Sequence, residues 1–156
     1  MTSKQDFTEQ EWTRIRRAPL VAGVAISLAD PGGPIEIAKE TMATLRSATL
    51  PPSQEELLAA VALDVQATTQ HKQNPLGDFK PTGGQQVLEE LKAVNELLTA
   101  KATPEEAEAF RGWLLDAAQA AANAGKEGGF LGFGAEQVSA GERQMLEQVR
   151  AVLGIA

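Results

Sequence analysis

Signals for helix starts recur along this sequence and constrain its fold more than any other feature. A capping box combines Ser or Thr before a helix with Glu or Gln three positions later, because each side chain then satisfies the other's unpaired backbone N–H group. Five such pairs precede apolar residues at helical spacing, which predicts an all-α fold. They are Thr8/Glu11, Ser53/Glu56, Thr82/Gln85, Thr103/Glu106 and Ser139/Glu142.

We expect about six helices in one bundle, separated by breaks rich in glycine and proline. The expected ranges are 8–30, 34–48, 53–71, 84–100, 103–125 and 139–153. Pro19 should kink or split the first helix, because its ring removes a hydrogen bond and clashes with the preceding turn. The apolar run Leu20–Leu28 also fits a buried strand, but no partner strand is visible and an isolated strand leaves its backbone unpaired.

Composition is compatible with a single domain, 1–156, built around one core. Apolar residues make up 43% of the chain but include only two Trp, five Phe and no Tyr, so Ala, Leu and Val must fill the interior. The chain has no cysteine, which excludes disulfides, thiolate catalysis and zinc–thiolate sites. We expect the 74–84 segment to connect the two halves of the chain, with Leu76 and Phe79 docked on the core.

Charge and hydropathy restrict the partners. The net charge of −7 repels nucleic acid and anionic membranes, so neither is expected as a partner. The longest apolar run, Ala18–Ala29, is shorter than the roughly 20 residues that cross a bilayer. Residues 1–17 carry charges where a secretory signal needs an apolar stretch, so a cytoplasmic location is expected.

Two parts of the chain share an arrangement, which suggests pseudo-repeats over 8–50 and 103–155. Thr8–Gly33 and Thr103–Gly129 each comprise a capped helix that ends at a Gly–Gly turn and precedes another helix. Two unrelated hairpins that both use glycine to end a helix explain the pattern equally well.

The turns of these repeats are rich in acidic residues and glycine. Carboxylates and loop carbonyls suit Ca²⁺ or Mg²⁺, whereas the alternative is a set of ordinary solvated carboxylates, since no EF-hand pattern is present. The acidic residues in question are Asp30, Glu36, Glu127 and Glu136. The glycine cluster 126–134 matches no phosphate-loop motif, and its Phe130, Leu131 and Phe133 favour a loop anchored on the core.

Few residues offer catalytic chemistry, and we expect no enzyme. Asp64 and Asp116 border apolar stripes, where a carboxylate either acts as a proton carrier or metal ligand, or pairs with a nearby cation. His71, the single histidine, falls at a polar helix end and is expected to face solvent. No GxSxG motif is present, so a triad hydrolase is not expected.

One dense basic patch offers a surface for an acidic protein partner or a phosphate. An ordinary solvated face is the alternative. The patch comprises Trp12, Arg14, Arg16 and Arg17. The apolar stripe of the helix over 103–125, which includes Phe110 and Trp113, predicts core packing or a seam between copies in a homo-oligomer.

The segments SLADPGGPIEIAKE (27–40) and AANAGKEGGFLGFGAEQVSAGERQMLEQVRAVLGI (121–155) resemble the tellurite-resistance TerB-like helical family. That family shows an alanine-rich helix, an acidic-glycine turn, a glutamate a few residues later and a final helix ending near Leu-Gly. The resemblance implies a non-enzymatic domain of the tellurite and chemical-stress response whose acidic residues bind a metal. Carried over to this chain, the metal ligands are Asp30, Glu40, Glu127 and Glu142.

Our leading hypothesis is therefore a non-enzymatic TerB-like domain that binds a divalent cation, a small ligand or a protein partner. The alternative is a ligand-free scaffold or interaction module that associates through the Arg–Trp patch or the alanine-rich helix. A third hypothesis, an enzyme that uses Asp64 or Asp116, requires a pocket that encloses one of these carboxylates.

Overall fold

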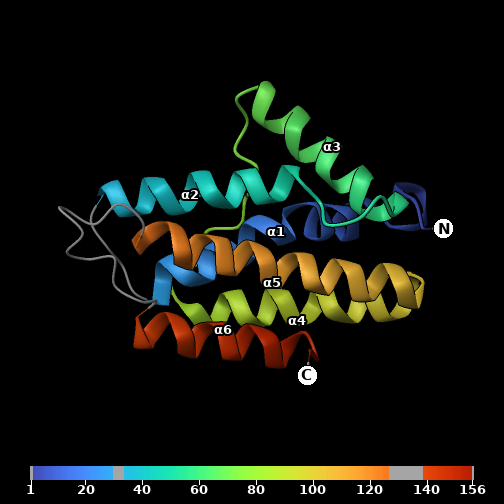
Figure 1. The fold of residues 1–156 in the computed structure, drawn as a ribbon. Helices are drawn as coiled ribbons and strands as arrows, with labels where there is room; N and C mark the ends of the chain where they lie inside the picture. Colours follow the sequence, from blue (N-terminus) through green and yellow to red (C-terminus); the bar gives the residue numbers. More distant parts are fainter. Residues whose placement is uncertain (1, 30–33, 127–138, 156) are drawn as a thin grey trace.

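The computed structural model describes residues 2–29, 34–126 and 139–155, and this part of the chain is helical without a strand. Each α-helix begins and ends within three residues of its predicted bounds, so the predicted all-α fold is confirmed. A short 3₁₀ helix, η1 (Lys4–Asp6), precedes the α-helices (Figure 1). These are α1 (Glu9–Ala29), α2 (Pro34–Thr49), α3 (Glu56–Gln70), α4 (Gly84–Lys101), α5 (Pro104–Lys126) and α6 (Ala140–Val152).

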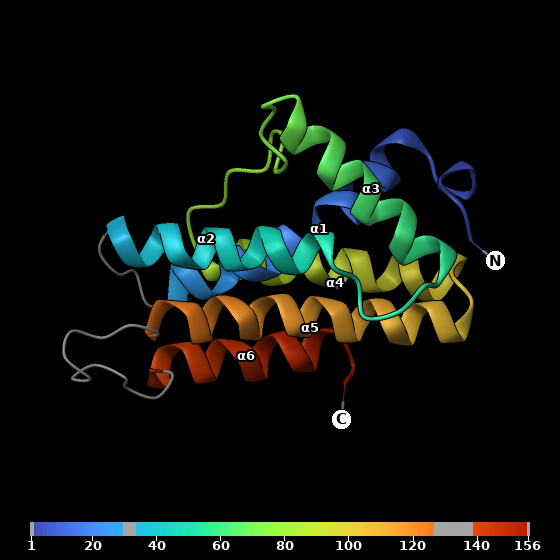
Figure 2. The ribbon, with the colours of Figure 1, turned by 45° about the horizontal axis from the view of Figure 1, so that its top comes forward.

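The helices form a bundle in which α1 and α5 run side by side in the same direction. Helices α2, α4 and α6 run the opposite way and pack around this pair, whereas α3 crosses the bundle at a steep angle (Figure 2). The C-terminal ends of α1 and α5 and the N-terminal ends of α2 and α6 therefore gather at one end of the bundle, at the left of Figure 1.

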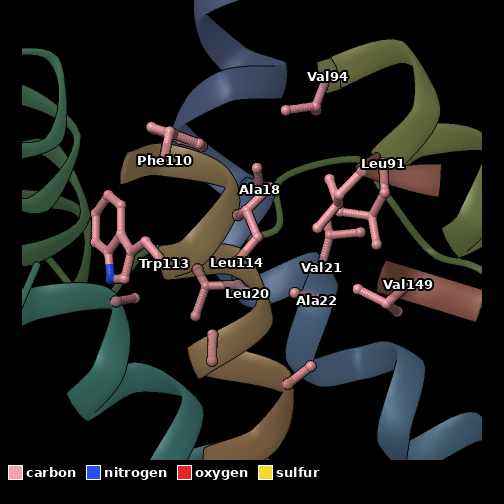
Figure 3. Packing of buried hydrophobic residues seen from close by; sticks show 14 of the residues in the cluster. Ala18, Leu20, Val21, Ala22, Leu91, Val94, Phe110, Trp113, Leu114 and Val149 are labelled. Atoms are coloured by element: carbon pink, nitrogen blue, oxygen red, sulfur yellow. The ribbon is translucent and has the colours of Figure 1, made fainter. Parts of the chain in front are cut away.

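The core is built around α1 and α5 with contributions from all the other helices, and small residues at its centre let the helices approach closely. On α1, Ala18, Val21 and Ala22 are fully buried in the middle of the cluster (Figure 3). Apolar side chains of α4 and α6 cover one side, and an aromatic pair of α5 covers the other. The covering residues shown are Leu91, Val94, Val149, Phe110, Trp113 and Leu114.

The stripe of α5 is core, as one of the two interpretations expected. Phe110 and Trp113 are fully buried and pack edge to face, with ring centroids 5.4 Å apart. The Trp113 indole also donates a hydrogen bond of 2.7 Å to the Ser47 carbonyl of α2, so a buried polar group is satisfied. This face is therefore filled within one chain.

Helix α1 is continuous through Pro19, so of the two expected effects of proline, a kink or a split, the split is wrong. The run Leu20–Leu28 is helical, which confirms helix over strand. Gly23 on this stretch lets α2 approach: a Cβ atom there would lie 2.2 Å from Oγ1 of Thr44. The α1–α2 pair is thus fixed by a small residue opposite a buried threonine.

Three of the five capping boxes form with both reciprocal hydrogen bonds, at Thr8/Glu11, Thr103/Glu106 and Ser139/Glu142. The box at Ser53 is wrong, because α3 begins only at Glu56, after an N-cap at Glu55. The box at Thr82 is also wrong, because α4 begins at Gly84 and Gln86 takes the Thr82 N–H instead.

Leu76 and Phe79 in the connection before α4 are partly buried against the core, as predicted. No helix of the described residues is long and apolar enough to cross a membrane.

Candidate functional site

Glu40 lies on the inner face of α2 and is only 2% exposed. Ser27, near the end of α1, donates a hydrogen bond of 2.5 Å from its hydroxyl to the Glu40 carboxylate. One turn further along α2, the Thr44 hydroxyl donates to the Glu40 carbonyl at 2.7 Å, beside the close approach at Gly23. The tight α1–α2 packing thus holds this carboxylate against the last turns of α1.

Glu142 lies in the first turn of α6 and is 1% exposed. Its carboxylate accepts the Ser139 N–H at 3.1 Å, and its own N–H donates to the Ser139 hydroxyl at 3.2 Å. The next residue toward the N-terminus, Gly141, packs on α1: a Cβ atom there would lie 3.0 Å from the Ala29 carbonyl oxygen. Glu142 is therefore also held near the end of α1.

The fold thus brings two of the four predicted metal ligands, Glu40 and Glu142, to one end of the bundle. We call this region the acidic end, defined by Ser27–Ala29 of α1, Glu40 and Ser139–Glu142. The other two predicted ligands, Asp30 and Glu127, fall outside the described residues, as does most of the glycine cluster 126–134.

The donor chemistry of the acidic end suits a hard cation, because carboxylate oxygens are the ligands that Ca²⁺ and Mg²⁺ prefer. Ligating carboxylates also accept hydrogen bonds, as both of these do. Within residues 2–29, 34–126 and 139–155, however, no three His, Asp or Glu side chains converge as a metal would require. A cation held here would need further ligands from the adjoining turns.

Glu106 is a further buried carboxylate, at the opposite end of α5. Glu106 is 2% exposed and accepts hydrogen bonds from the backbone and hydroxyl of Thr2, from the hydroxyl of Thr103 and from the N–H of Leu57. Burial alone would raise the pKa of this carboxyl, but the hydrogen bonds from Thr2 and Thr103 outweigh it and lower the pKa. The sequence indicated only its local cap.

Asp64 lies at the boundary of the core and its carboxylate pairs with a nearby cation, as one of the two interpretations expected. It accepts the Trp12 indole N–H at 2.7 Å and pairs with the Lys4 ammonium at 3.1 Å. Asp116 on α5 is exposed, and partial burial of its carboxyl raises its pKa. His71 forms the exposed C-cap of α3, as predicted.

The predicted open Arg–Trp surface does not form, because two of its members are used inside the fold. Trp12 is only 5% exposed. The Arg17 guanidinium pairs with the buried carboxylate of Glu90 and lies over the Phe79 ring, 4.9 Å from its centroid. The physical reason is that an aromatic ring and a long side chain bury apolar area when α3 and the connection before α4 cover this face.

Of the remaining members, Arg14 is exposed and lies 3.6 Å from a Glu90 oxygen. Arg16 is half-buried, and its Nε atom is buried without a hydrogen-bond partner among the described residues. A partner surface that uses all four side chains is therefore not available.

No model of a known protein family matches this chain, and neither a curated protein nor a solved structure shows significant similarity to it.

Proposed function

We propose that this chain is a non-enzymatic helical domain that binds a divalent cation at the acidic end of its bundle. The observation that supports the proposal is that two nearly fully buried glutamates lie at one end of the bundle, Glu40 bonded to Ser27 of α1 and Glu142 next to the contact of Gly141 with Ala29. Both side chains offer carboxylate oxygens, the ligands that Ca²⁺ and Mg²⁺ prefer.

The proposal assigns the further ligands to Asp30 and Glu127, which directly follow α1 and α5 in the chain. This set is the one that the resemblance to the TerB-like family implies. From the same resemblance we propose that the domain acts in the response to tellurite or other chemical stress.

Thermal unfolding of chelator-stripped protein against Mg²⁺, Ca²⁺, Mn²⁺ and Zn²⁺ tests the proposal. A ligand that binds only the folded state raises the unfolding temperature by mass action, so one cation should give a saturable rise. The Glu40→Gln, Glu142→Gln double variant should lose the rise, as should Asp30→Ala, Glu127→Ala.

The matched control is the Glu96→Gln, Glu147→Gln double variant. It removes two exposed carboxylates, so it changes the net charge by the same amount, but it should keep the full response. No shift with any cation up to about 1 mM, the weak end for protein calcium sites, would discard cation binding. An equal loss in the control variant would show that the rise in unfolding temperature depends on the overall negative charge and not on a specific site.

A ligand-free interaction module is the alternative function, and exposed apolar side chains on α2 favour it. Ile35 and Met42 lie seven positions apart and are 73% and 63% exposed, and Ile37 is 42% exposed. Large apolar groups gathered on one helix mark a contact surface when they form a patch. Concentration-dependent mass that is abolished by Met42→Glu, without any response to cations, would favour this function over cation binding.

A further inference from the structure

Arg111 on α5 carries a guanidinium group that neighbouring helices hold in a fixed orientation. Its Nε donates a hydrogen bond of 2.6 Å to the Asn95 side-chain carbonyl, and its Nη2 donates one of 3.0 Å to the Thr99 hydroxyl. Asn95 is itself anchored, because its amide donates to the Val152 carbonyl at the end of α6 at 3.3 Å. The guanidinium is thus positioned before any ligand arrives.

The charge of Arg111 is not neutralised by the part of the chain that the structure describes. No carboxylate there lies within 4.0 Å of its nitrogens, whereas Arg17 pairs with Glu90 and Lys101 pairs with Glu11. Its Nη1 group donates no hydrogen bond to a described residue. This atom is not buried, so it is accessible to a ligand. An oriented guanidinium without a carboxylate partner can bind the anionic group of a ligand.

Arg111 lines a hollow of 490 Å³ between α4, α5 and the segment that follows α6. Beyond Arg111, one wall of this hollow is apolar, and its only acidic lining residue is Glu108. The apolar lining consists of Leu98, Ala102, Pro104, Ala107 and Ile155.

We propose that this hollow binds a small organic monocarboxylate, with the carboxylate on the Arg111 guanidinium and the apolar body against the apolar wall. A planar guanidinium fork matches a carboxylate in geometry and charge. One cation balances one negative charge, whereas a phosphate dianion would leave a second charge beside Glu108 without a counter-ion. The volume of the hollow falls within the range of small-molecule sites.

The site is independent of the proposed cation site. It lies around the first two turns of α5, and Arg111 is 15 residues, about 22 Å at 1.5 Å per residue, from Lys126, the last residue of this helix and the one nearest the acidic end. Failure of one proposal therefore leaves the other standing, because the two use different residues and opposite charges.

Titration of the full chain with benzoate, followed by amide chemical shifts, tests the proposal. Benzoate should bind saturably in about the millimolar range, as expected for a ligand of this size. The neutral isostere benzamide and the small anion acetate should each bind at least about tenfold more weakly, because each lacks one half of the recognition. Inorganic phosphate that binds more tightly than benzoate would overturn the monocarboxylate assignment.

Arg111→Gln should weaken benzoate binding at least about tenfold, the usual cost of a charge-assisted hydrogen bond. The control Arg143→Gln removes an exposed cation of α6 and changes the net charge equally, so it should bind as the unmodified chain does. Equal binding by the Arg111 variant, or equal weakening by both variants, would overturn the proposal.

Glu108→Gln leaves the guanidinium and its anchors in place and keeps the proposal testable if Arg111→Gln does not fold. Removal of a like charge from the lining should strengthen benzoate binding about threefold, since exposed pairs of this kind contribute up to about 1 kcal/mol. Binding that is unchanged or weaker in Glu108→Gln would contradict a carboxylate in this hollow.

Discussion

The two ends of α5 each border a buried glutamate that completes a capping box, yet the two carboxylates are held in different ways. Glu106, at the start of α5, takes donors from its own cap and from two distant segments, at Thr2 and Leu57. Glu142, near the other end of α5, takes the N–H of its own cap residue, Ser139. One short motif therefore serves both a local cap and a long-range anchor.

The difference indicates which buried carboxylate has a mainly structural role. Glu106 joins the start of the chain, the start of α3 and the start of α5 through a single side chain that is 2% exposed. A carboxylate with that many donors is fully occupied, so it is not a candidate for metal or substrate. We therefore assign Glu106 a structural role in joining these three segments.

The largest test of the contrast is Glu106→Ala. Its loss leaves the buried N–H groups of Thr2 and Leu57 without an acceptor, and we expect the free energy of unfolding to fall by about 3 kcal/mol. Urea denaturation at neutral pH measures the change. Glu105→Ala, in the same turn but exposed, should cost less than about 0.5 kcal/mol. Similar losses in both variants would remove Glu106 as an anchor.

The pH dependence of stability should also single out Glu106. Its pKa is lowered in the folded state, so its contribution is complete above the pKa of the unfolded chain, about 4.3, and is lost as pH falls through the lower folded pKa. Denaturation midpoints measured from pH 6 down to about 3 should fall less steeply in Glu106→Gln. An identical slope in the variant and the unmodified chain would contradict the assignment.

The helices could be predicted from the sequence because their signals are local. Apolar spacing and caps placed α1 and α5 within a residue of their bounds. The cap expected at Ser53 failed for a reason that no local pattern contains: the second N–H of α3, that of Leu57, is taken by Glu106. A donor satisfied across the fold needs no neighbour in sequence to cap it.

The candidate site was less predictable, because burial depends on which helices meet. Trp12 looked like part of an open surface beside three arginines, but α3 brings Asp64 to its indole and covers it. No sequence pattern indicated a role for Arg111, because its neighbours Asn95 and Thr99 come from another helix. Asp64, by contrast, was placed correctly at the edge of a stripe, which helical spacing does determine.

A smaller test compares the two caps directly through Thr103→Ala and Ser139→Ala. Each variant loses the N-cap acceptor, which costs about 1 kcal/mol. The Thr103 hydroxyl also donates to the buried Glu106 carboxylate at 3.0 Å, so its loss should cost about 1 kcal/mol more. Chemical denaturation of the two variants side by side gives the difference. Equal costs would show that Glu106 does not depend on its local cap.

The smallest expected effect comes from Asp116, an exposed carboxylate of α5 that has no hydrogen-bond or ion-pair partner among the described residues. Its pKa is raised by partial burial, the opposite of Glu106, so its charge is less favourable in the folded state than in the unfolded chain. Stability should therefore fall slightly as pH rises past the unfolded pKa of aspartate, about 3.9.

Asp116→Asn should remove this cost and stabilise the chain at neutral pH by at most a few tenths of a kcal/mol, since solvent screens an exposed group. Asn and Asp have similar helix propensities, so the substitution isolates the charge. Precise melting temperatures at pH 7 and at about pH 3 should show the gain only at the higher pH. Opposite signs for Asp116→Asn and Glu106→Gln at neutral pH, on one helix, would establish that hydrogen-bond donors rather than position along α5 decide how a carboxylate of this helix affects stability. A loss of stability in Asp116→Asn would instead require a favourable partner for this charge and would end that argument.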